Sequence, residues 1–293
     1  MTEEKNSCSH DCAHCSVKHD SCSDPSEREL KFIAQMANIK HKIIVLSGKG
    51  GVGKSTVSVN IAFTLAMAGH RVGLMDVDFH GPSIPTMLGI KGAHTESENN
   101  AILPIEVAGV KVISVDFFLD NSDNAVIWRG PMKQGAIKQF LEDVAWGELD
   151  FLIIDCPPGT GDEPLALCQI VKGDKRAVVV TTPQEVAAAD VRKSLDFCAK
   201  LSLPVIGVIE NMSGFACPHC NTVTYIFKQG GGEKLAAQAQ VPFLGRIPID
   251  PTVVDSSDAG LPLVCKYPDS PTAKAFAEVV RPIGKLLQDE AEA

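Results

Sequence analysis

The chain has 293 residues, and 27 lysines and arginines against 36 aspartates and glutamates give it a formal net charge of −9. That balance argues against a protein that coats DNA or an anionic lipid surface. With 45% hydrophobic and 22% charged residues, the chain can bury a large core, which excludes disorder along most of its length. No hydrophobic run exceeds four residues, so no segment is apolar enough to span a membrane.

The opening sequence MTEEKNSCSH is polar and contains no apolar signal region, so we expect a cytoplasmic protein in a reducing compartment. Its ten cysteines are then expected to be thiols or metal ligands. Four of them stand alone in the sequence, namely Cys156, Cys168, Cys198 and Cys265. An isolated free cysteine is most often a small buried hydrophobe, so we assign these four no function.

Residues 1–26 are rich in Ser, His, Asp and Cys and contain almost no aliphatic side chains apart from Val17. Such a segment buries too little apolar surface to fold, so we expect a disordered tail unless a metal holds it together. From about residue 40 the pattern changes. Short β-branched runs at 42–46, 71–75, 110–115, 151–154, 176–180 and 204–209 alternate with helix-length stretches such as 54–68, 131–145 and 185–201.

Unbroken apolar strands that alternate with helices indicate a mostly parallel sheet with helices on both faces. Gly69 follows the first predicted helix, as a glycine at a helix C-terminus does. We see no internal repeat and no linker after residue 40. The sequence therefore predicts one doubly wound α/β domain over residues 27–293, preceded by the cysteine-rich tail of residues 1–26.

The strand sequence KIIVLS runs directly into a glycine-rich loop and then into the apolar helix pattern TVSVNIAFTLAMA. The loop matches G-x-x-x-x-G-K-[ST] in the strand, loop and helix order that a P-loop requires. Backbone N–H groups of such a loop converge on phosphate oxygens, Lys54 reaches the β- and γ-phosphates, and Ser55 places its hydroxyl on Mg²⁺. The predicted nucleotide site consists of Gly48, Lys49, Gly50, Gly51, Val52, Gly53, Lys54, Ser55 and Thr56.

Two acidic loops follow strand-like runs: Asp76 and Asp78 come after RVGLM, and Asp155 comes after FLII. Carboxylates at the C-terminal ends of parallel strands lie along the crevice where ligands bind in open α/β sheets. Asp155 fits the second acidic element of P-loop enzymes, which holds Mg²⁺ or its water. An aspartate after a strand can instead cap a helix. The P-loop upstream favours the metal role.

Several motifs resemble one family of dimeric ATPases. Lys49 gives the loop the deviant form KGGVGKST, and DVDFHGPS, WRGPM, DCPPGTGD, TTPQEVAAADVRKS, ENMSGFACPHC and GRIPID follow in order over roughly residues 30–285. Together they are similar to the Mrp/ApbC iron–sulfur carriers, a branch of the group that includes MinD, the ParA partition ATPases and the nitrogenase iron protein. The resemblance implies that Lys49 reaches the phosphates of a partner chain and that Asp78 positions the attacking water. It also implies that Asp155 supports Mg²⁺ and that Asn211 contacts adenine.

Cys217 and Cys220 form a C-x-x-C pair in the sequence CPHC. A four-thiolate site needs two more ligands, which a symmetric dimer supplies from its second copy. The resemblance implies a four-iron four-sulfur cluster that bridges the two chains at this position. A thioredoxin-type redox pair is an alternative, although such a pair opens a helix and the following NTVTYIF is strand-like. The same two cysteines are also compatible with a four-thiolate zinc site or with an unliganded pair.

The tail contains Cys8, Cys12, Cys15 and Cys22, which are enough ligands for one four-thiolate site within one chain. Some cytosolic relatives in the family carry an N-terminal four-cysteine cluster, with a much longer first gap between the cysteines. Three histidines lie among these cysteines (His10, His14 and His19), so a mixed Cys/His zinc site is an alternative to iron–sulfur. A tail that captures metal only transiently is the third alternative.

These features predict a slow ATPase that forms a homodimer, assembles a labile iron–sulfur cluster and passes it to apo iron–sulfur proteins. A MinD- or ParA-like positioning ATPase is one alternative, but the chain ends in the acidic sequence KLLQDEAEA, which anionic headgroups would repel. An ATP-driven iron–sulfur reductase is another, but the nitrogenase iron protein bridges its cluster with widely separated single cysteines. We expect no nucleic-acid partner and no membrane partner.

Overall fold

A computed structural model of the chain describes residues 27–119, 129–217, 219–220 and 222–288, with the backbone alone at 27 and 185–188. One eight-stranded sheet lies at its centre, in the order β12-β9-β8-β1-β7-β2-β6-β5. Its strands are β1 (Ile39–Ser47), β2 (Val72–Asp76), β5 (Ile105–Val107), β6 (Val110–Ser114), β7 (Leu149–Asp155), β8 (Lys175–Thr181), β9 (Val205–Glu210) and β12 (Phe243–Arg246). Two small hairpins, β3 (Ser97–Glu98) with β4 (Ala101–Ile102) and β10 (Phe215–Ala216) with β11 (Val223–Thr224), stand apart from it.

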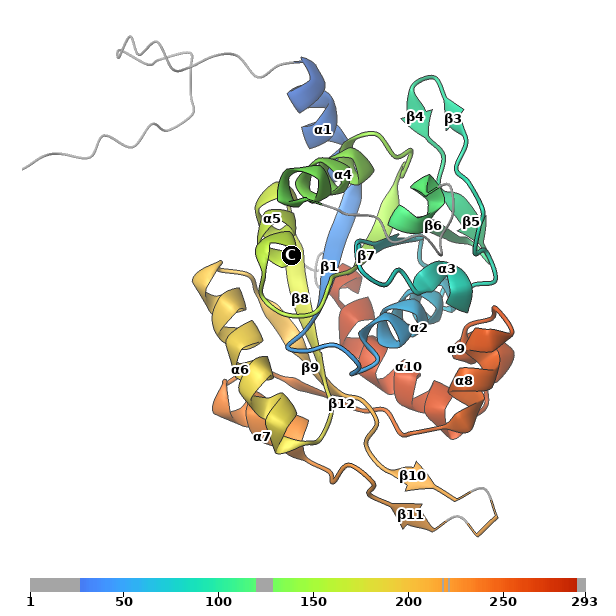
Figure 1. Ribbon diagram of the computed structural model, residues 1–293, viewed down its shortest axis with the longest axis vertical. Coiled ribbons are helices and arrows are strands. Elements are labelled where there is room, and N and C mark those ends of the chain that lie inside the picture. Colours follow the sequence, from blue (N-terminus) through green and yellow to red (C-terminus); the bar gives the residue numbers. More distant parts are fainter. Residues whose placement is uncertain (1–26, 120–128, 218, 221, 289–293) are drawn as a thin grey trace, which may run out of the picture.

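The helices lie in two layers, one on each face of the sheet (Figure 1). One layer contains α4 (Gly130–Glu142), α5 (Asp162–Ile170), α6 (Glu185–Lys200) and α7 (Gly231–Gln238). The other contains α2 (Lys54–Met67), α8 (Pro251–Asp258), α9 (Leu263–Lys266) and α10 (Pro271–Gly284). The remaining helical segments are α1 (Glu27–Ala37), α3 (Ile84–Met87) and the 3-10 turn η2 (Val115–Phe118).

Every paired strand of the large sheet runs parallel to its neighbour except β5, which is antiparallel to β6. The central strand β1 lies between β7 and β8, with Ile44 opposite Ile154 and Ala177. All seven residues of β7 are buried, which is why its sequence is an almost unbroken apolar run. The carboxyl ends of β1, β2, β7, β8 and β9 therefore meet at one edge, where the functional residues lie.

The predicted mostly parallel doubly wound α/β fold is confirmed, and each predicted strand and helix is present. The helix expected at 131–145 ends earlier, at Glu142, because the next residues pair with the β4 hairpin. There Ile102 N donates to Asp143 O over 2.8 Å, and Ala145 N donates to Ile102 O over 2.8 Å. The strand-like NTVTYIF contributes only the two residues of β11. In the part of the chain that the structure describes, every helix is too short or too polar to cross a bilayer.

Candidate nucleotide and thiolate sites

The phosphate loop connects the end of β1 to the start of α2, as predicted. Gly51 and Gly53 have φ angles of 77° and 78°, a left-handed conformation that glycine adopts without strain. A Cβ at Gly53 would also collide with the Asn211 amide nitrogen, and one at Gly48 would collide with Asp190 of α6. The loop surrounds a hollow of about 200 Å³, which Lys49, Asp78, Ser83 and Pro158 also line. The sequence motif, the left-handed glycines and the hollow that the loop surrounds are each typical of a phosphate-binding loop.

Lys54 and Ser55, the first two residues of α2, both contact Asp155 at the end of β7. Lys54 Nζ lies 2.8 Å from Asp155 Oδ1, and the Ser55 hydroxyl donates to Asp155 Oδ2 over 2.6 Å. Ser58, one turn further along α2, donates to Asp155 Oδ1 over 2.6 Å. Burial alone would lower the Lys54 pKa, but the Asp155 carboxylate more than offsets this and the pKa is raised. The site thus holds a charged lysine beside a hydroxyl and a carboxylate, the donor set that Mg²⁺–nucleotide requires.

Asp76 and Asp155 lie opposite one another in the register of β2 and β7, both fully buried. Asp76 accepts hydrogen bonds from Asp78 N over 3.1 Å and from the Ser114 hydroxyl over 3.2 Å. Burial, with the neighbouring Asp155 charge, raises the Asp76 pKa to about 8. Asp78 lies in the phosphate-loop hollow itself, and burial raises its pKa as well. The sequence showed Asp76 only as part of a motif, because its burial depends on strand pairing.

A second group of polar contacts joins the loop after β2 to helices α4 and α5. Lys133 Nζ lies 2.9 Å from His80 Nε2 and also contacts Glu163 Oε1. Lys133 is nearly buried. Burial tends to raise the Glu163 pKa, but the hydrogen bond from Lys133 outweighs burial, so the Glu163 pKa is lowered. Sequence reasoning missed these three residues. The motifs HGPS, RGPMK and GTGDE each carry one of them, but only the fold brings the motifs together.

Asn211, which follows β9, holds the phosphate loop through a hydrogen bond to its backbone. Its amide nitrogen donates to Val52 O over 2.8 Å, and its side chain is nearly buried. Asn211 also borders a hollow of about 240 Å³ with Met212, Pro248 and Ile249. This hollow adjoins the loop through Gly53, which lines both. An adenine role for Asn211 remains a prediction, and the structure adds a role in holding the loop.

Cys217 and Cys220 lie at the tip of the β10–β11 hairpin, which projects from the body of the domain (Figure 1). Cys217 is half-buried, Cys220 is exposed, and Cys217 N donates to Thr222 O over 3.0 Å. Cys220 Sγ lies 3.3 Å from the Thr222 hydroxyl oxygen, and this hydrogen bond lowers the Cys220 pKa. No three His, Cys, Asp or Glu side chains gather as a metal site within 27–119, 129–217, 219–220 and 222–288. The described part of one chain therefore offers two thiolates here.

Three of the four isolated cysteines are buried as small hydrophobic side chains are, and the fourth is only partly covered. Cys156, Cys168 and Cys198 are buried, and burial raises the pKa of Cys168 to about 11 and of Cys198 to about 12. Cys265 is half-buried. Such thiols stay protonated at neutral pH. The tail cysteines, Cys8, Cys12, Cys15 and Cys22, lie outside the described residues.

The parallel sheet, the phosphate loop and its buried Lys54–Asp155 pair define a P-loop nucleotide-binding protein. The chain belongs to the ParA family of NUBPL iron-transfer P-loop NTPases, whose family model matches residues 38–284. This confirms the resemblance that the motifs indicate.

Named relatives agree with this assignment. The chain is 49% identical over 261 residues to the iron-sulfur cluster carrier protein of Saccharolobus solfataricus, covering 89% of this chain and 88% of that protein. It is 50% identical over 251 residues to the cytosolic Fe-S cluster assembly factor NUBP2 homolog of Culex quinquefasciatus, covering 84% and 98%. Among solved structures, it resembles the nucleotide-binding protein of Archaeoglobus fulgidus in complex with ADP, with TM-score 0.71, 40% identity, and 79% and 90% coverage.

Proposed function

We propose that this protein is an ATP-binding carrier that holds a labile four-iron four-sulfur cluster on Cys217 and Cys220 and transfers it to apo iron–sulfur proteins. The observation that carries the proposal is that the phosphate loop and the cysteine hairpin are both attached to the segment that follows β9. Asn211, directly after β9, holds the phosphate loop, and the cysteine hairpin begins four residues further on. Relatives named as iron–sulfur carriers and assembly factors support the cargo, and the ADP complex of a relative supports the nucleotide.

The nucleotide chemistry follows from the residues around the loop. Lys54 compensates the β- and γ-phosphate charge, and the Ser55 hydroxyl with Asp155 fits Mg²⁺, which when bound neutralises charge that develops on the phosphates. Asp78 borders the same hollow and orients the attacking water, with its raised pKa making it a better proton acceptor. The hydrolysis is slow, because the nucleotide serves to select a conformation.

The cluster site needs a second chain. Two thiolates per chain and a four-thiolate cluster require a two-fold dimer with the hairpins facing one another. Val223, Tyr225 and Ile226 beside the cysteines are large apolar side chains that are each about half exposed, as expected of a surface that another chain covers. Lys49 lines the nucleotide hollow and forms no ion pair within the described part of the chain. It is thus available to the partner's phosphates.

The tail cysteines supply one further four-thiolate set, which we propose binds a second cluster; zinc there is the alternative that metal analysis separates. We place the protein in the cytosol, as the name of the Culex quinquefasciatus relative supports.

The test is anaerobic reconstitution with iron and sulfide, followed by Mössbauer spectroscopy and transfer to an apo-ferredoxin with and without Mg-ATP. In a chain lacking residues 1–24, we expect Cys217→Ser and Cys220→Ser each to abolish cluster binding and to loosen the cluster-dependent dimer. Cys265→Ser is the matched control, since it removes a half-buried thiol on α9, beside Met67 and apart from the hairpin (Figure 1). A Cys217→Ser protein that still binds and transfers a full cluster would exclude the bridging site.

A further inference from the structure

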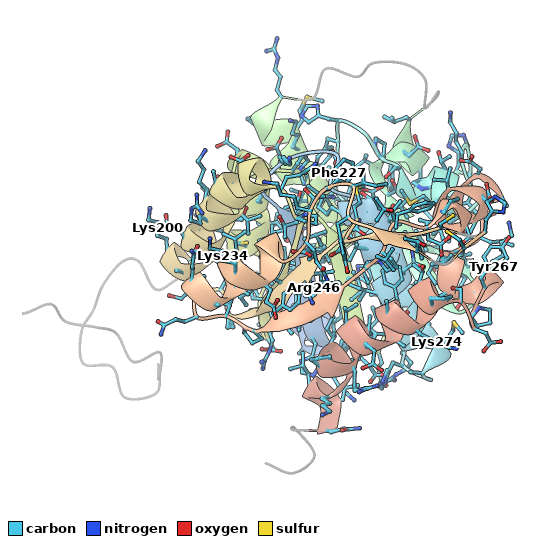
Figure 2. All side chains as sticks on the ribbon, turned by 90° about the horizontal axis from the view of Figure 1, so that it is seen from below. Lys200, Phe227, Lys234, Arg246, Tyr267 and Lys274 are labelled. Atoms are coloured by element: carbon cyan, nitrogen blue, oxygen red, sulfur yellow. The ribbon has the colours of Figure 1, made fainter. Side chains whose placement is uncertain are left out.

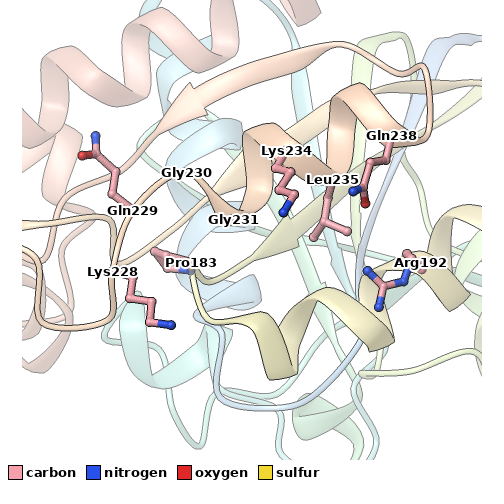
Figure 3. Close-up of a pocket in the computed structure, with 9 residues that line it drawn as sticks. All are labelled: Pro183, Arg192, Lys228, Gln229, Gly230, Gly231, Lys234, Leu235 and Gln238. Atoms are coloured by element: carbon pink, nitrogen blue, oxygen red, sulfur yellow. The ribbon is translucent and has the colours of Figure 1, made fainter.

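A groove runs along the seam between α6 and α7 and joins two hollows, of about 480 Å³ and 440 Å³. Arg192, Leu235 and Gln238 line both hollows, so the two form one continuous surface, which we call the α6–α7 groove. Figure 3 shows Lys234, Leu235 and Gln238 directed from α7 toward Arg192 on α6. Each half has the size of a ligand site, and the larger exceeds the hollow at the phosphate loop.

One half of the groove is basic, although the whole chain is acidic. Arg192, Lys228 and Lys234 line it, and no aspartate or glutamate does. None of these three cations forms an ion pair with a residue of the described part of the chain. On a protein with a net charge of −9, three cations around one hollow that form no ion pair with the described side chains favour an anionic ligand at this place.

Three described carboxylates in or near the groove are engaged with other partners. Glu210 is fully buried and accepts hydrogen bonds from the backbone N–H groups of Gly230 and Gly232, at the start of α7. Glu233 pairs with Arg246, and Asp196 pairs with Lys200 over 2.8 Å. The helix N-terminus thus has its own internal anion. Among the described side chains, none forms an ion pair with Arg192, Lys228 or Lys234.

The other half of the groove is largely apolar, and Asp196, which also lines it, pairs with Lys200. Leu195, Ala199, Leu203, Val205 and Val241 line it, over a small buried cluster that includes Leu195 and Leu235. A free phosphate or a polyphosphate would leave this half uncovered. An acidic polypeptide with an aliphatic side chain fits both halves, because its carboxylates meet the cations and its apolar side chain covers the leucines.

The basic end of the groove adjoins the segment that follows the cysteine hairpin. Lys228 follows β11 by four residues, and its backbone N–H donates to Tyr225 O over 3.1 Å, where the hairpin rejoins the domain. We propose that the α6–α7 groove docks an acidic segment of the recipient apoprotein, with an aliphatic side chain in its apolar half, and so brings the recipient to Cys217 and Cys220. The identity of the partner, a recipient apoprotein, rests on the proposed carrier function. The binding of an acidic segment in the groove does not.

The test is fluorescence anisotropy with the full chain in Mg-ATP and a labelled peptide of alternating glutamate and leucine. We expect binding that weakens as salt rises, and that weakens roughly tenfold or more in the double variant Arg192→Glu with Lys234→Glu. Gln238→Trp, which fills the groove without changing the charge, should also weaken binding. Lys274→Glu on α10 is the control for a single charge reversal, to be compared with Lys234→Glu alone, because it changes an exposed lysine far from α7 (Figure 2).

A peptide with glutamine in place of glutamate should bind at least tenfold more weakly. The proposal is overturned if this peptide binds equally well, or if Lys274→Glu weakens binding as much as the groove variants do. It is also overturned if inorganic pyrophosphate or single-stranded DNA displaces the acidic peptide at equal charge concentration, since the groove would then be a general anion site.

The cluster experiments separate this inference from the carrier function. The groove double variant should bind ATP and cluster as the wild type does, yet transfer the cluster more slowly to an acidic apo-ferredoxin at low salt. Failure of the wild type to hold a cluster would remove the carrier function while leaving the peptide result intact. Unchanged transfer in the double variant would overturn the docking role.

Discussion

The Lys54 ammonium lies 2.8 Å from Asp155 Oδ1, and both side chains are buried at the foot of the phosphate loop. Two residues about a hundred positions apart in the sequence thus neutralise one another where the nucleotide binds. A buried pair of this kind is costly to break from one side, because the remaining charge is left without compensation. The pair therefore ties nucleotide binding to the stability of the fold.

Replacing Lys54 by Ala should abolish ATP hydrolysis, weaken nucleotide binding and destabilise the nucleotide-free protein by roughly 3 kcal/mol, since Asp155 loses its counter-ion. Urea unfolding and phosphate release measure the two effects. Lys49→Ala is the informative comparison: it should lower hydrolysis through the dimer while leaving the free energy of unfolding unchanged. Unaltered turnover in Lys54→Ala would exclude the phosphate-binding role.

Asp76 should make the stability of the nucleotide-free protein fall as pH rises from about 4 to about 8. Its pKa is about 8 in the folded protein and about 3.9 in an unfolded chain. Between these values the native state keeps a proton that the unfolded state has lost, so raising the pH favours unfolding. Asp76→Asn should flatten this part of the profile in urea unfolding without Mg²⁺, whereas Asp269→Asn, at an exposed position, should not. An unchanged slope in Asp76→Asn would contradict the burial effect.

The Thr222 hydroxyl should control the reactivity of Cys220. Because its hydrogen bond lowers the Cys220 pKa, Thr222→Val should raise that pKa and reduce the thiolate fraction at neutral pH. Alkylation by iodoacetamide, read at Cys220 by mass spectrometry over a pH series, should then be slower. Thr224→Val, two residues along the same hairpin, serves as the control. Equal alkylation rates in both variants would mean that Thr222 does not set the pKa.

Deleting residues 1–24 should leave the domain folded and able to bind ATP, because the segment contributes little apolar surface. If the four tail cysteines hold a cluster of their own, iron per chain falls after reconstitution, and if they hold zinc, zinc falls instead. Metal analysis by mass spectrometry distinguishes the two. The same iron and zinc content with and without the tail would show that these cysteines hold no fixed metal.

The features that the sequence predicts well are those set by nearby residues. The strands can be predicted because β1 and β7 are buried on both faces, which requires continuous apolar runs. The phosphate loop can be predicted because its glycines, Lys54 and Ser55 are close together in the chain. Asp76 illustrates the opposite case, since its burial and its raised pKa follow from its register opposite Asp155.

Further parts of the site depend on segments that meet only in three dimensions. The Lys133 contact with His80 and Glu163 draws on three separate motifs, none of which alone indicates an interaction. The α6–α7 groove is similar, because Arg192 and Lys234 are ordinary surface residues in the sequence. Their significance comes from the carboxylates nearby being engaged with other partners, which no sequence pattern reveals.

The same short segment of chain supports the phosphate loop and leads to the cysteine hairpin. From Asn211, whose amide holds the Val52 carbonyl, the chain reaches Cys217 in six residues, and on the way Met212 adopts a left-handed φ of 57° that is unfavourable for its side chain. Ser213 fixes the same stretch by donating its backbone N–H to Ile247 O over 2.9 Å. This short segment, held at Asn211 and at Ser213, links the phosphate loop to the cysteine hairpin. We therefore expect that any movement of the phosphate loop on nucleotide binding is passed through this segment to the hairpin that carries Cys217 and Cys220.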